Sequence, residues 1–186
     1  MAVQVAPTRR RFSREEYYRM AEAGILGEDD RVELIEGEIV EMSPIGDRHV
    51  AFVMNLGRLL TLRLGDRAFL SVQNPVVLTA DTEPQPDLAV LRPRAYKERK
   101  PHADDVLLLI EVADTSLAYD RTTKLRLYAQ AGIPEYWIVD CATESLEVYR
   151  DPSGENYRDV VRISVPATLR PQTFPHVDLT LAEIFG

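Results

Sequence analysis

A near-continuous apolar run at residues 106–113, VLLLIEVA, constrains the fold more than any other part of the sequence. Such runs are typical of central strands that are covered by helices on both faces. A helix is expected next, from Arg121 to about Ala131, with Asp120 as its N-cap and Gly132 after its end. The segment EYWIVD, at residues 135–140, then predicts a second strand. Residues 106–140 therefore indicate a buried strand–helix–strand unit.

Hairpins are predicted toward both ends of the chain. Residues 31–42, RVELIEGEIVEM, form two short strands around Glu36 and Gly37, and residues 146–165 form another pair around the turn at 151–154. Further strands are expected at 68–72, 76–79 and 87–91, and helices at 13–23, 181–185 and, with Asp47 as its N-cap, up to Gly65. Hairpins argue against a purely parallel sheet, so the predicted fold class is α/β, with a mixed β-sheet flanked by helices.

Length and composition exclude several classes of protein. The 186 residues are 45% apolar with a net charge of −8, which is typical of a globular chain and fits a single domain at 1–186. No apolar stretch approaches the roughly 18 to 20 residues of a membrane span, and the N-terminus lacks the apolar core of a signal peptide, so we expect a cytoplasmic protein. A single cysteine, Cys141, excludes an internal disulfide and a multi-cysteine zinc site, and we expect its thiol to be buried. Phosphate-loop, dinucleotide, zinc-protease and serine-hydrolase motifs do not occur in the sequence.

Two carboxylates stand where the chain predicts buried strands. Glu111 interrupts the apolar run, on the same face as Leu109 and Ala113, and an unpaired buried charge there costs several kcal/mol. Asp87 follows Pro86 at the start of the strand DLAVL. If neighbouring strands bring them together, they form an oxygen-ligand site for Mg²⁺ or Mn²⁺ that suits phosphodiester hydrolysis. The alternatives are a strand end that emerges into solvent for Glu111 and a turn role for Asp87.

Three further side chains are candidates for the same site. Lys124, in a chain with 19 arginines among 22 basic residues, lies 13 residues after Glu111 in the first turn of the expected helix and can reach back over the strand end. Glu33 is another acid within an apolar strand. His49 is suited to proton transfer or to a hydrogen bond that supports a residue in direct contact with the metal. For each, an ordinary solvated position is the alternative.

The order of these segments resembles a known family. RVELIEGEIVEMSP, then His49, then PQPDLAV, LLLIEVADTS and YDRTTKLRLYAQAGIPEYWIVD are similar to the Uma-two family of restriction-endonuclease-like proteins, in the PD-(D/E)xK nuclease superfamily, over roughly residues 12–150. The resemblance implies a restriction-endonuclease-like fold, with Asp87 and Glu111 as metal ligands and Glu33 as a further acid. The superfamily lysine would fall at position 113, where this chain has Ala113, so Lys124 is the expected replacement. His49, Asp120 and Tyr128 match recurring positions behind the catalytic residues.

The hypothesis is a magnesium- or manganese-dependent DNA endonuclease with a PD...E...K site. The resemblance places its core at about 12–150 after a flexible leader at 1–11. Because cutting both strands of a duplex is naturally done by two copies, we expect a homodimer that acts on double-stranded DNA. A basic segment supplies candidate phosphate contacts: Arg92, Arg94, Lys97, Arg99 and Lys100. The net charge and Ala113 leave two rivals open: a non-catalytic nucleic-acid-binding or assembly module that keeps the fold, and a structural oligomer whose acids are solvated.

Overall fold

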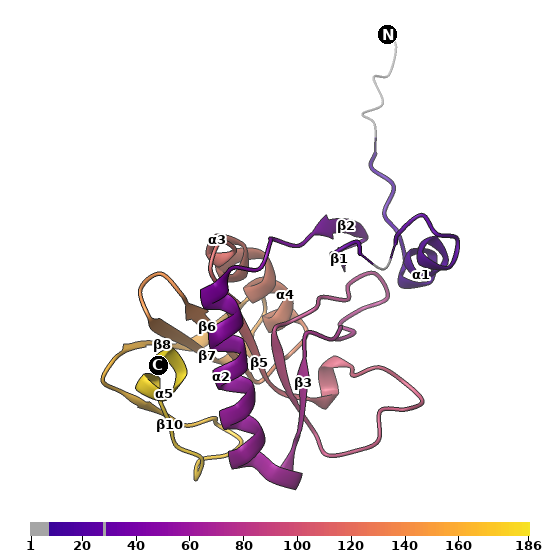
Figure 1. Ribbon diagram of the computed structural model, residues 1–186. Helices are drawn as coiled ribbons and strands as arrows, with labels where there is room; N and C mark the ends of the chain where they lie inside the picture. Colours follow the sequence, from indigo (N-terminus) through magenta and orange to yellow (C-terminus); the bar gives the residue numbers. More distant parts are fainter. Residues whose placement is uncertain (1–7, 28) are drawn as a thin grey trace.

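A six-stranded mixed sheet forms the centre of the protein in a computed structural model that describes residues 8–27 and 29–186 (Figure 1). Its strand order is β3-β4-β5-β6-β7-β8, and only β5 and β6 run parallel. This arrangement confirms the predicted fold class. The strands are β3 (Phe69–Val72), β4 (Leu88–Leu91), β5 (Val106–Ala113), β6 (Glu135–Asp140), β7 (Ser145–Ser153) and β8 (Asn156–Ser164).

The parallel pair is joined by a helical crossover in three pieces. These are α3 (Leu117–Tyr119), a single π-helical turn η3 (Asp120–Lys124) and α4 (Leu125–Gln130). The helix therefore begins before the expected Arg121, and the prediction that Asp120 is its N-cap is wrong. Asp120 has helical backbone angles, and its side chain accepts a hydrogen bond from Ser116 Oγ at 2.5 Å. Isolated π-turns are often found at functional sites, and this one carries Lys124.

Helices cover both faces of the sheet. The long helix α2 (Asp47–Leu64) packs on one face, and α4 packs on the other (Figure 1). The alternation along β5 follows this division, because Leu108, Ile110 and Val112 join the α2 side. Leu109 and Ala113 join the α4 side, and Glu111 faces the same way, as predicted.

The C-terminal segment belongs to the hydrophobic core. β9 (Thr168–Leu169) pairs with β10 (Leu179–Thr180), and α5 (Leu181–Phe185) follows. Leu179, Leu181 and Ile184 are fully buried in the cluster that includes α2. The core thus extends beyond the expected limit of about residue 150.

A separate two-stranded hairpin lies outside the central sheet. It consists of β1 (Val32–Ile35) and β2 (Glu38–Glu41), and it follows α1 (Arg14–Glu22), whose predicted capping box at Ser13 is present. Gly37 has a φ of +76°, and a Cβ there would collide with Arg11, so only glycine fits this turn. The bridge between Leu34 and Glu83, together with hydrogen bonds from the N–H groups of Glu36 and Gly37 to Thr82 and Asp81, connects the hairpin to the segment that precedes β4.

Several predicted elements differ in detail. Residues 76–79 do not form a strand, because Val76 and Leu78 donate to the nearby carbonyls of Pro84 and Thr82, and Val77 makes only one bridge. Asp47 is the first residue of α2, and Gly46 is its N-cap. Of the expected leader, residues 1–7 lie outside the described part, and residues 8–11 are exposed. The remaining short elements are η1 (Gly65–Arg67) and η2 (Ala103–Asp105). In the described part of the chain, no helix has the length and apolar character needed to cross a bilayer.

Candidate active site

A pocket of about 310 Å³ opens where β5 ends and the crossover begins. The hairpin, the loop before α2 and the residues after β5 form its walls. The structure brings most of the predicted site residues to its lining: Glu33, His49, Asp87, Glu111, Asp120 and Lys124. Tyr128 lies behind the lining, fully buried, and its hydroxyl donates to Glu111 Oε1 at 2.7 Å.

Asp87 and Glu111 come from neighbouring antiparallel strands. Leu88 pairs with Ile110, so the next position places Asp87 opposite Glu111. Asp87 Oδ2 also accepts a hydrogen bond from the backbone N–H of Val112 at 2.8 Å. Both residues are buried, with 9% of Asp87 and 3% of Glu111 exposed, so the solvent-facing alternative for Glu111 does not hold.

Lys124 reaches the same carboxylates from the crossover. Its Nζ lies 2.9 Å from Glu111 Oε1 and 3.6 Å from Glu33 Oε2. Burial alone would lower the pKa of Lys124, but the negative charges of Glu111 and Glu33 outweigh burial and raise it. The ammonium group therefore stays charged in a buried position.

Acidic groups outnumber cations in this pocket, and the pKa values reflect it. Burial raises the pKa of Glu111 to about 8; Lys124 opposes this rise, and Asp120 and Asp87 add to it. Burial likewise raises the pKa of Asp120 to about 6, against the charge of Lys124 and the hydrogen bond from Ser116. An added cation would favour the ionised form of both groups.

Asp87 is ionised more readily than its burial alone would allow. Burial acts to raise its pKa, but hydrogen bonds from His49 and Val112 lower it below the ordinary value. His49 Nε2 lies 2.9 Å from Asp87 Oδ1. The other ring nitrogen, Nδ1, is buried and has no hydrogen-bond partner among the described residues. His49 therefore orients Asp87 and leaves one polar atom at the pocket wall.

Glu33 differs from the other acids of the hairpin. Its side chain turns inward, with 4% of the residue exposed, and its Oε2 accepts a hydrogen bond from the backbone N–H of Gln85 at 3.1 Å. Glu38 and Glu41 are exposed, and Glu36 pairs with Arg126 at the surface. The alternative of a solvated strand thus holds for its neighbours and not for Glu33.

The basic segment proposed for phosphate contacts is not brought to the pocket. It leaves β4 at the end where Leu91 pairs with Val106, which is opposite to the end at Asp87. Arg94 and Arg99 pair with the buried carboxylate of Asp105 at 3.0 and 2.8 Å. Lys100 pairs with Glu83 at 2.9 Å, Arg92 donates to the carbonyl of Asp104, and Lys97 is exposed. A role for these residues in binding nucleic acid stays a prediction.

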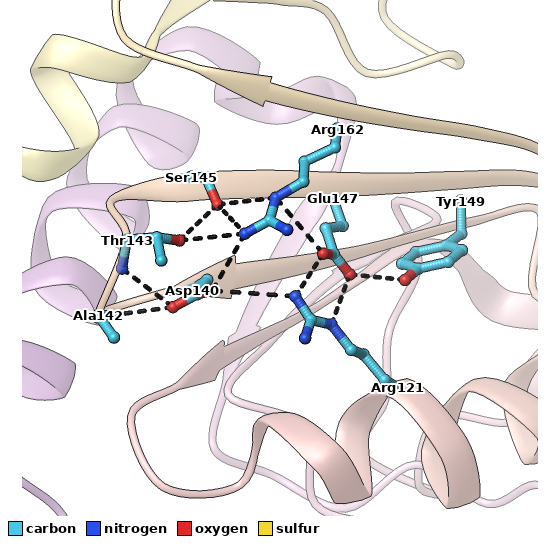
Figure 2. A network of polar contacts seen from close by, with 8 residues as sticks. All are labelled: Arg121, Asp140, Ala142, Thr143, Ser145, Glu147, Tyr149 and Arg162. Atoms are coloured by element: carbon cyan, nitrogen blue, oxygen red, sulfur yellow. Dashed lines mark hydrogen bonds and ion pairs between the residues drawn. The ribbon is translucent and has the colours of Figure 1, made fainter.

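A second polar network, which the sequence reasoning missed, holds the π-turn in place. Arg121 forms two hydrogen bonds to Glu147, Nε to Oε2 at 3.0 Å and Nη2 to Oε1 at 2.6 Å (Figure 2). Glu147 also accepts from Tyr149, and Arg162 reaches Asp140 from the edge strand β8 (Figure 2). Arg121 is three residues before Lys124, so this pairing with β7 fixes the turn that carries the lysine. The available signal was Glu147, an acid inside the apolar strand LEVYR.

Comparisons with known proteins identify the family and support the fold. The Uma2 family, described as "Putative restriction endonuclease", matches residues 14–182. The chain belongs to the Uma2 family. Restriction-endonuclease-like families generally use divalent metals and act on nucleic acid.

Individual proteins are also similar to this chain. An uncharacterized protein of Synechocystis sp. is 28% identical over 128 residues, which cover 65% of this chain and 72% of that protein. The crystal structure of a protein from Anabaena variabilis, described as a putative nuclease belonging to DUF820, superposes with a TM-score of 0.72 at 18% identity. It covers 94% of this chain and 97% of that one, and it shows the same fold.

Proposed function

We propose that this chain is a divalent-metal-dependent endonuclease that hydrolyses phosphodiester bonds in DNA. The observation that carries the proposal is the convergence of Asp87, Glu111 and Lys124 in one pocket, although the first and the last are 37 positions apart in the sequence. Two carboxylates and one cation are the groups that this hydrolysis uses. Membership of the Uma2 family supports the reaction class.

The donor atoms of the pocket fit a hard cation. Asp87 and Glu111 offer carboxylate oxygens from facing strand positions, and Mg²⁺ needs only one or two carboxylates because it keeps several waters. The raised pKa of Glu111, to about 8, is the response of a carboxyl group in a buried site with too little positive charge. When bound, a divalent ion supplies activation of water and neutralisation of phosphate charge.

The chain's own residues then have distinct roles. Lys124 neutralises charge that develops on the phosphoryl oxygens, since its ammonium is already fixed at the carboxylates. Glu33 holds Lys124 from the other side, and His49 orients Asp87. Tyr128 fixes the rotamer of Glu111 through its hydroxyl.

A direct test is cleavage of plasmid, linear duplex and single-stranded DNA with Mg²⁺ or Mn²⁺. We expect Asp87→Ala and Glu111→Ala each to lower the cleavage rate by at least about 100-fold. Asp159→Ala, which removes an exposed carboxylate from β8, is the matched control and should cleave like the wild type. Equal cleavage by all three variants would refute the assignment of the site.

A non-catalytic nucleic-acid-binding module is the second candidate. Within residues 8–27 and 29–186, no group of three or more His, Cys, Asp or Glu side chains is arranged to hold a metal. Titration with Mn²⁺ separates the candidates, because the endonuclease should bind the ion and lose that binding in Asp87→Ala. DNA binding without metal binding or cleavage would favour the module.

A homodimer remains part of the proposal, because a two-fold pair of sites suits the cutting of both strands of a duplex. Light scattering after size-exclusion chromatography measures the mass directly. A monomer that still cuts both strands would refute the proposed homodimer.

A further inference from the structure

Two arginines flank the loop at residues 42–46, most of which lines the pocket. Arg31 belongs to the lining, and Arg48 lies outside it, next to the lining residue His49. Arg31, just before β1, donates from Nη1 to the carbonyl of Ser43 at 2.9 Å. Arg48, in the first turn of α2, donates from Nη1 to the carbonyl of Cys141 at 3.1 Å. Both arginines are exposed, and among the described residues their other guanidinium N–H groups donate to no protein atom.

These two arginines differ from most others in the chain. Arg14, Arg121 and Arg150 each pair with a buried carboxylate, which neutralises their charge. In the part of the chain that the structure describes, Arg31 and Arg48 pair with no carboxylate and are held by backbone carbonyls alone. Their positive charge is therefore oriented by the fold without being neutralised by it.

The negative charge of the pocket explains why a nucleic acid needs positive side chains beside it. Six carboxylates line it, whereas only Arg31 and Lys124 are cationic among its lysine and arginine side chains; the acids are Glu33, Glu41, Asp87, Glu111, Asp114 and Asp120. A polyanion that approaches this pocket is repelled unless positive charge surrounds the mouth. Arginine suits this position, because its planar guanidinium binds phosphate through two parallel hydrogen bonds.

We propose that Arg31 and Arg48 bind backbone phosphates of a polynucleotide adjacent to the phosphate that enters the pocket. This inference rests on the proposed function, since it names the groups that hold the nucleic acid at that site. It locates phosphate binding at the loop before α2. The basic segment at 92–100 lies at the opposite end of β4 and has three of its five cations paired with acids.

The test measures binding in a Lys124→Ala background, so that strands stay intact. Fluorescence anisotropy of a labelled 20-nucleotide DNA, single-stranded and as a duplex, gives the affinity at several salt concentrations. We expect Arg31→Gln and Arg48→Gln each to weaken binding about tenfold or more and to reduce the slope of log K against log[salt] by about 0.7 to 0.9. Such a loss should be similar for different sequences, because phosphate contacts carry no base information.

A matched control removes a positive charge elsewhere. Arg58→Gln acts on an exposed arginine farther along α2. It should bind like the parent, and all variants should melt at similar temperatures. An equal loss in Arg58→Gln, or unchanged binding in Arg31→Gln and Arg48→Gln, would overturn the proposal.

The outcomes also separate this inference from the catalytic proposal. If the wild type cleaves DNA and both Arg31→Gln and Arg48→Gln bind it normally, the endonuclease proposal holds and the phosphate-binding role of the two arginines is refuted. If Arg31→Gln and Arg48→Gln bind DNA more weakly but the wild type does not cleave it with any metal ion, the phosphate-binding role is supported and the endonuclease proposal is refuted. If the protein binds no nucleic acid, both the endonuclease proposal and the phosphate-binding role of Arg31 and Arg48 are refuted.

Discussion

Lys124 Nζ lies 2.9 Å from Glu111 Oε1, although the two residues are 13 positions apart and belong to different elements. The contact exists because the π-turn after β5 folds back over the end of that strand. Position 113, two residues after Glu111 on the same face, holds a buried alanine instead. The crossover therefore supplies a cation that the strand lacks.

The lysine can be tested by moving it. Lys124→Ala should lower cleavage by about 100-fold or more, because it removes the only ammonium that contacts these carboxylates within residues 8–27 and 29–186. Adding Ala113→Lys to this variant returns an ammonium from the strand, and we expect part of the activity to recover. Measured rates for both variants decide the matter, and a double variant no better than Lys124→Ala would contradict this geometry.

Tyr128 should contribute to stability through its hydroxyl. Tyr128→Phe leaves a buried carboxylate oxygen with one fewer donor, so we expect a loss of about 1–2 kcal/mol in the free energy of unfolding. Tyr157→Phe is the matched control, because the Tyr157 hydroxyl is also buried but has no partner among the described residues. Urea denaturation should show Tyr157→Phe to be neutral or stabilising. Equal losses in both variants would contradict the assigned role of Tyr128.

The Arg121–Glu147 pair should matter for stability and for catalysis together. Arg121→Met leaves the buried Glu147 with fewer hydrogen bonds, and we expect a loss of about 1–3 kcal/mol in urea denaturation. Cleavage should also fall, since the turn that carries Lys124 loses its attachment to β7. Arg158→Met, which breaks an exposed pair with Asp151, should cost about 0.5 kcal/mol or less and leave the rate unchanged.

Glu83 predicts a specific dependence of stability on pH. Burial acts to raise its pKa, but hydrogen bonds from Tyr18, Lys100 and Arg14 outweigh burial and hold the pKa below the ordinary value of 4.5. A carboxyl group with a lowered pKa in the folded state stabilises the fold above its unfolded pKa and loses this effect as pH falls through the folded pKa. The stability difference between wild type and Glu83→Gln should therefore be full above about pH 4.5 and shrink at lower pH. Thermal melts across pH 2.5 to 7 would show this, and a constant difference would contradict it.

Cys141 should be unreactive in the folded protein. It is fully buried, and burial raises the pKa of its thiol to about 12, so thiolate is scarce at neutral pH. Ellman's reagent should react slowly with the native chain and at once in denaturant. Rapid reaction under native conditions would show that the end of β6 opens.

Local patterns predicted most of the fold because they act over short distances. The apolar run of β5, the Ser13 capping box and the Glu36–Gly37 turn each depend on adjacent residues, and each is present. The predicted start of the crossover helix was wrong. Asp120 has a side chain that suits an N-cap, but it accepts its hydrogen bond inside a helix that begins earlier. Residues 76–79 have strand composition, yet their backbone pairs with a nearby turn.

Some residues of the candidate site could likewise be predicted from local sequence, and others could not. Acids inside apolar strands pointed to Glu33 and Glu111, because a buried charge needs a partner wherever the strand lies. Gln85, whose backbone N–H holds Glu33, gave no signal, since any residue has that group. The pairing of Arg94 and Arg99 with Asp105 was equally invisible, because it depends on how a long connection folds back on itself.

The hairpin forms one wall of the pocket and lies outside the central sheet. β1 and β2 pair only with each other, but hydrogen bonds connect Leu34, Glu36 and Gly37 to residues 81–83, Glu33 accepts from Gln85, and Glu36 pairs with Arg126. These contacts involve β1 and the turn, whereas β2 is half-buried to exposed. Hydrogen exchange should therefore be faster in β2 than in the buried strand β5. The shape of the pocket thus depends in part on loop and side-chain contacts rather than on pairing with the central sheet.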